Sequence, residues 1–138
     1  MTREPIYAAL FALLSASAGF NTKSRRLKMW PDVNKADQPA IFQIQKNEQA
    51  VTVTNMPTRW TLKVDIYLYA NTSDVSQSPS QILNPLLDAI TAALKSNGEN
   101  QTLGGLVTYC RISGAIETDE GVLGDQSVAI IPIEILTI

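Results

Sequence analysis

The chain has 138 residues, of which 45% are hydrophobic and 17% are charged, and it carries a formal net charge of −2. This length fits a single domain, 1-138, with a core that needs no metal or disulfide. The weak negative charge argues against a general attraction to nucleic acid, and the lack of histidine excludes a standard Ser-His-Asp triad.

Residues 3–18 predict a helix, because apolar residues recur there at helical spacing. The predicted stripe consists of Ile6, Leu10, Leu13, Leu14 and Ser17, and Thr2 is the expected cap. The apolar run 6–18 is too short to span a bilayer, and only Arg3 precedes it, which disfavours a signal peptide. We therefore expect no membrane partner.

A basic stretch follows at residues 23–28 and holds four of the eleven positive charges: Lys23, Arg25, Arg26 and Lys28. It is interpreted as a solvated face, a contact for an acidic protein patch, or a nucleic-acid contact. Leu27, Met29 and Trp30 flank it and favour a protein contact, since Trp, Met and Arg are typical of interface cores.

Residues 39–46 alternate weakly and predict a strand, and residues 47–57 are either a mobile loop or a long hairpin tip. Residues 58–70 predict the clearest strand, with apolar side chains on one face from Trp60 to Ala70. Tyr67 and Tyr69 fall on its polar face. They are expected to pack under the helices or under a neighbouring subunit.

A second helix is predicted from Pro79 to Ser96, with an apolar stripe of Ile82, Leu83, Leu86, Leu87, Ile90 and Leu94. Pro85 leaves two alternatives: an early start with a bend, or a start capped by Asn84. Strands are predicted at 106–117 and 127–137, the second at an edge or bulged because Pro132 lacks a ladder donor. The order predicts an α+β fold: a mainly antiparallel four- to five-stranded sheet with two helices packed on one face.

Four carboxylates cluster near the C-terminus: Glu117, Asp119, Glu120 and Asp125. They are interpreted as a solvated connection, a protein contact or a calcium site, although the EF-hand pattern is missing. Cys110 is expected to be a small buried hydrophobe. A hydrolase using Asp65, Glu117 and Asp119 is the contrasting hypothesis, but no spacing favours it. We expect no enzymatic activity, no cofactor and no metal.

Several segments resemble, in a fixed order, a small tail protein of long-tailed bacteriophages. The segments are I-Y-A-A-L-F-A-L at 6–13, R-R-L-K-M-W-P-D-V at 25–33, Q-P-A-I-F-Q at 38–43, W-T-L-K-V-D-I-Y-L-Y at 60–69, L-N-P-L-L-D-A-I at 83–90, Q-T-L-G-G-L-V at 101–107 and G-x-I-E-T-D-E-G-V-L-G-D-Q at 114–126. The group they resemble most is the tail-terminator, or tail-completion, proteins. Other neck and tube components are similar in size and remain the alternative.

The resemblance implies a small α+β protein that forms a six-fold ring, caps the tail tube and offers a surface to the head-side connector. It implies a virion location at the neck of the tail, with assembly in the host cytoplasm. Spheres of about 37 Å, the size of a compact chain of this length, leave a central hole about one sphere wide in a ring of six. DNA would pass through that hole without specific binding.

A closed ring requires two different patches of one subunit to meet. We hypothesise that the predicted subunit interface joins a basic and an acidic set across copies: Arg25, Arg26, Lys28 and Trp30 with Glu117, Asp119, Glu120 and Asp125. The tube or neck contact is predicted in the loop at 47–57, through Asn47, Glu48, Gln49, Val51, Val53 and Asn55.

Overall fold

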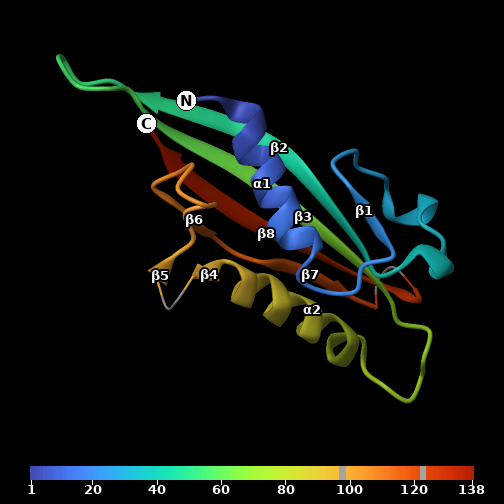
Figure 1. Cartoon of the computed structure of the whole chain (residues 1–138). Coiled ribbons are helices and arrows are strands. Elements are labelled where there is room, and N and C mark those ends of the chain that lie inside the picture. The colour runs from blue at the N-terminus through green and yellow to red at the C-terminus, as the bar shows by residue number, and fades with distance from the viewer. Residues whose placement is uncertain (97–98, 122–123) are drawn as a thin grey trace.

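A long, twisted sheet carries both helices on one of its faces (Figure 1). The computed structural model describes residues 1–96, 99–121 and 124–138. The strands of this sheet are β1 (Thr22–Ser24), β2 (Ala40–Val51), β3 (Arg59–Asn71), β6 (Tyr109–Ile112), β7 (Glu117–Glu120) and β8 (Gln126–Thr137). The strand order is β1-β2-β3-β8-β6, and β7 pairs with β8 on the same side as β6. A separate short ribbon pairs β4 (Lys95–Ser96) with β5 (Glu99–Asn100).

The predicted α+β class, with helices on one face, is confirmed. Within the described residues the sheet has six strands, not four or five. It is mixed, because β1 runs parallel to β2 while the other pairs are antiparallel. A strand of three residues is too short to show a periodic pattern, so β1 could not be predicted from the sequence.

The main core lies between the helices and the sheet. Buried side chains of α1 (Arg3–Ser15) and α2 (Pro79–Ala93) meet the apolar face of β3, whose predicted alternation is confirmed. Helix α1 ends at Ser15 instead of residue 18, and there the Ser17 hydroxyl donates to the Leu14 carbonyl. Thr2 is at the predicted N-cap position, but its side chain makes no capping hydrogen bond.

Helix α2 takes the earlier of its two predicted starts. Pro79 is its first residue, and the Gln81 side chain accepts a hydrogen bond from the Ser78 backbone N–H. Pro85 therefore lies inside the helix. Leu83 and Ile90 are buried against the sheet, as the stripe predicts.

Strands β2 and β3 form a long hairpin, which is the second of the two alternatives for residues 47–57, and residues 47–51 are strand. The register shifts between Gln45 and Glu48, where β2 carries a bulge. Beyond the hairpin's last pair, the Met56 N–H donates to the Val53 carbonyl at 2.9 Å, with Asn55 at φ 64°. Asparagine tolerates this left-handed conformation, which closes the turn.

Strand β8 is central, which corrects the prediction of an edge strand. It pairs with β3 along one side, and with β6 and β7 along the other. Pro132 faces the gap between β6 and β7, where the Ser113 N–H donates to the Pro132 carbonyl. The missing N–H of proline is tolerated at this break. The predicted strand 106–117 is likewise divided, and Glu117–Glu120 is a strand instead of a loop.

Candidate interaction surfaces

The face of the sheet away from the helices, here called the rear face, has a small core of its own. The segment 25–37 leaves β1 and folds back over this face, placing Val33 against Ala40, Phe42 and Tyr69. The rings of Phe42 and Tyr69 lie 5.5 Å apart in a tilted arrangement. This segment, and not the helices, therefore covers Tyr69 within the chain.

Tyr69 also fixes the basic stretch in place. Its hydroxyl donates a 2.8 Å hydrogen bond to the Lys28 carbonyl. Burial, and to a smaller extent the nearby Tyr67, raises the pKa of Tyr69 to about 12, so the hydroxyl stays protonated at neutral pH. Leu27 and Trp30 pack beside it.

Next to this small core is an open groove of about 380 Å³. Its walls are mainly apolar and aromatic, with two carboxylates: Leu27, Met29, Trp30, Tyr67, Tyr69, Glu117, Thr118, Asp119, Val128 and Ile130. Met29 is 59% exposed, which is high for a large apolar side chain. Concave apolar surfaces with a few polar groups are typical of binding sites.

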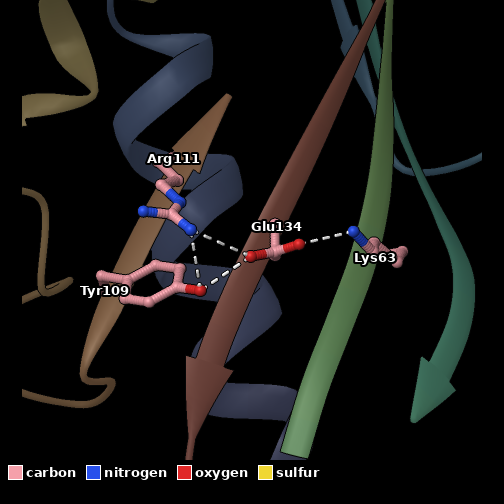
Figure 2. Close-up of polar contacts among 4 residues, drawn as sticks. All are labelled: Lys63, Tyr109, Arg111 and Glu134. Carbon is pink, nitrogen blue, oxygen red and sulfur yellow. Dashed lines mark hydrogen bonds and ion pairs between the residues drawn. The ribbon is translucent and has the colours of Figure 1, made fainter. Parts of the chain in front are cut away.

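A polar network occupies the next part of the rear face (Figure 2). Glu134 of β8 accepts hydrogen bonds from Nζ of Lys63 at 2.6 Å and from the Tyr109 hydroxyl at 2.7 Å. The Arg111 guanidinium lies 3.5 Å from the same carboxylate and 4.1 Å from the centre of the Tyr109 ring. The Glu134 side chain is only 15% exposed.

These contacts decide what Glu134 can do chemically. Its hydrogen bonds from Lys63 and Tyr109 lower its pKa from the usual 4.5 to about 2. A carboxylate held so firmly in its ionised form is poorly matched to proton transfer near neutral pH. The network is therefore suited to joining β3, β8 and β6.

The tip of the β2–β3 hairpin, residues 51–59 (the arm tip), is the second apolar surface. Val51, Val53 and Met56 are 53%, 61% and 62% exposed. They line a shallow hollow of about 250 Å³ together with Pro57, Arg59 and Ile138. The arm tip extends beyond the helices, at the end of the molecule that holds both termini (Figure 1). Clustered exposed apolar side chains of this kind mark contact surfaces.

The predicted subunit interface is divided by the fold. Trp30, Glu117 and Asp119 lie together at the groove. Arg25 instead pairs with Glu4 of α1 in the same chain. Glu120 accepts a hydrogen bond from the Ser80 N–H at the start of α2, on the other face of the sheet. Arg26, Lys28 and Asp125 are exposed.

The predicted contact loop is divided too. Asn47 and Gln49 are exposed strand residues. Glu48 turns back to α1, where it accepts hydrogen bonds from Arg3 at 2.8 Å and from the Tyr7 hydroxyl at 2.9 Å. Only Val51, Val53 and Asn55 belong to the arm tip. Met56, Arg59 and Ile138 were missed, because single apolar or charged residues in a polar segment carry no periodic signal.

No protein-family model and no curated protein matches this sequence. Among the side chains that the structure describes, no group of three or more His, Cys, Asp or Glu residues could hold a metal ion. None of the helices in this part of the chain is long and apolar enough to cross a membrane.

Proposed function

We propose that this protein is a tail terminator of a long-tailed bacteriophage, a structural protein without enzymatic activity or cofactor. Copies would form a six-fold ring on the last ring of the tail tube. One observation carries most of the proposal: the rear face has two unlike contact surfaces, the groove and the arm tip, at opposite ends of the sheet. Unlike surfaces that meet head to tail are what a closed ring requires.

The proposed mechanism is occupancy. The ring pairs with the last tube ring and presents a different surface upward, so that no further tube subunit can add. That upper surface binds the head-side neck or connector protein. DNA passes through the central hole, and the chain's net charge of −2 suits a lumen that does not bind the phosphate backbone.

A second candidate is another neck or tail-tube component. Both candidates also draw on the sequence resemblance, whose motifs are packing and turn residues and identify a family better than a role. Neighbouring neck and tube proteins have related folds and sizes. The two candidates differ in outcome: a terminator limits tube length, whereas a tube component is incorporated along the tube.

Tube polymerisation in vitro tests the proposal. Purified protein added to growing tail tubes should stop elongation, form one ring at one end seen by electron microscopy, and make the tubes competent to join heads. Tubes of unchanged length with no ring at the end would contradict the function. A label found along the whole tube would support the second candidate.

A further inference from the structure

We propose that the arm tip of one copy binds in the rear-face groove of a neighbouring copy. The number of copies that this contact joins rests on the proposed function. The two surfaces themselves do not depend on it. It also differs from the basic and acidic pairing expected from the sequence.

The two surfaces are complementary in polarity. The arm tip offers exposed aliphatic and thioether side chains, Val51, Val53 and Met56. The groove offers aromatic and aliphatic walls, including Trp30 and Tyr67, with space for several side chains. Burying exposed apolar area on both sides stabilises such a contact, and this gain must exceed the entropic cost of association.

The surfaces are also complementary in charge. Arg59 is the one formal charge within residues 50–59. It is exposed and makes no ion pair or hydrogen bond through its side chain to any residue of the described ranges. Among the described residues that line the groove, the charged ones are Glu117 and Asp119, and both are acidic. Arg59 on the tip would thus meet the exposed carboxylate of Glu117, which favours binding of the tip in the groove.

The distance along β3 requires the contact to be made between copies. Arg59 lies eight to ten residues from Tyr67 and Tyr69 on the same extended strand, which is roughly 26–33 Å. The tip cannot reach the groove of its own chain. Two copies joined by one such contact therefore leave one tip and one groove unused. Both are used only when further contacts close the assembly.

The tip is ordered before it binds. Besides the Met56–Val53 hydrogen bond, the hydroxyls of Thr52 and Thr58 are 2.8 Å apart across the hairpin. An arm that is already folded loses less conformational entropy on binding than a loop that must become ordered.

Disulfide cross-linking between copies tests the proposal. Val53→Cys and Met29→Cys are made as separate variants, and the wild type is the control because its Cys110 is fully buried. Mixing the two variants under mild oxidation should give a mixed disulfide dimer at least tenfold above the yield of either variant alone. Equal yields from the mixture and from the single variants would overturn the proposal.

Both substitutions in one chain distinguish this proposal from the ring function. A ladder ending at six copies would support both. A product that stops at two copies would support the tip-in-groove contact as a reciprocal dimer and contradict the ring. Rings seen by electron microscopy, without any mixed disulfide, would leave the function standing and overturn the contact.

Charge reversal supplies an independent readout. Arg59→Glu should lower the mixed-disulfide yield about three- to tenfold, and Glu117→Arg in the partner variant should restore it. The matched control is Lys95→Glu, an exposed cation that is not among the described residues lining either surface, and it should leave the yield unchanged. A larger loss from Arg26→Glu than from Arg59→Glu would instead favour the pairing predicted from the sequence.

Discussion

Glu134 of β8 accepts a 2.6 Å hydrogen bond from Lys63, the residue directly opposite it on β3. On its other side it faces Arg111 of β6, again as the direct register partner. One carboxylate thus joins three strands, and a shift of either neighbouring strand by one residue would move its partner to the helix side. This network therefore helps to fix the register of these three strands.

Replacing Glu134 with glutamine should destabilise the fold. The amide keeps the size of the side chain but loses the charge that Lys63 and Arg111 neutralise, at a cost of about 1–3 kcal/mol. Urea unfolding followed by circular dichroism measures the change. Glu117→Gln is the matched control, because Glu117 is exposed and should change stability by less than about 0.5 kcal/mol. Equal effects from both variants would contradict the structural role of the network.

The same carboxylate should make stability depend on pH in the acid range. Its pKa is about 2 in the folded protein against a usual 4.5, so its contribution is complete above about pH 4.5. It is lost as the pH falls from 4.5 towards 2. The stability difference between wild type and Glu134→Gln should therefore shrink between pH 6 and pH 2.5, measured as urea midpoints. A difference that stays constant over this range would show that Glu134 titrates normally.

Tyr69→Phe should loosen the segment that covers the rear face. It removes the hydrogen bond to the Lys28 carbonyl while keeping the ring contact with Phe42, and should cost about 0.5–1.5 kcal/mol. Hydrogen exchange should rise in residues 25–37 more than in the helices. Tyr67→Phe is the control, because the Tyr67 hydroxyl makes no hydrogen bond to the part of the chain that the structure describes.

Cys110 should be unreactive in the folded protein. Its thiol is fully buried in the main core, and burial raises its pKa to about 12. Since the thiolate is the nucleophile, Ellman's reagent at pH 8 should label it only after unfolding in guanidinium chloride. Rapid labelling of the native protein would mean that β6 separates readily from the core.

Leu10→Ala tests the docking of α1. Leu10 is completely buried between α1 and the sheet, so its truncation should cost about 2–5 kcal/mol and lower the melting temperature. Leu13→Ala on the same helix is only partly buried and should cost clearly less. Similar losses would indicate that α1 is packed differently.

The parts of the fold that follow a local period could be predicted from the sequence. The alternation along β3 and the stripe of α2 each reflect one element burying one face, and both are confirmed. Strand β2 was predicted too short, because residues 47–51 are polar and exposed and become strand only by pairing with β3. Pro132 was misplaced for a similar reason, since its tolerance depends on the gap between β6 and β7.

The candidate surfaces were less predictable than the fold. Trp30 and Met29 stood out by residue type, but their approach to Glu117 depends on segment 25–37 crossing the rear face. Charge alone suggested Arg25 as an interface residue, and only the packing of α1 shows that Glu4 already neutralises it. Arg59 and Met56 belong to a candidate surface because the hairpin places them at its end, and this position cannot be recognised from a short stretch of sequence.

The bulge in β2 has a consequence for how copies of this chain can meet. Past Phe42, the outer side of β2 pairs with no other strand of the described residues, and a straight strand there would invite a second copy to add its backbone. The bulge between Gln45 and Glu48 interrupts the ladder, and Lys46 places a charge on that stretch. Endless ribbons built through main-chain pairing are thereby discouraged. Association is left to side chains, whose shapes can specify a finite number of copies.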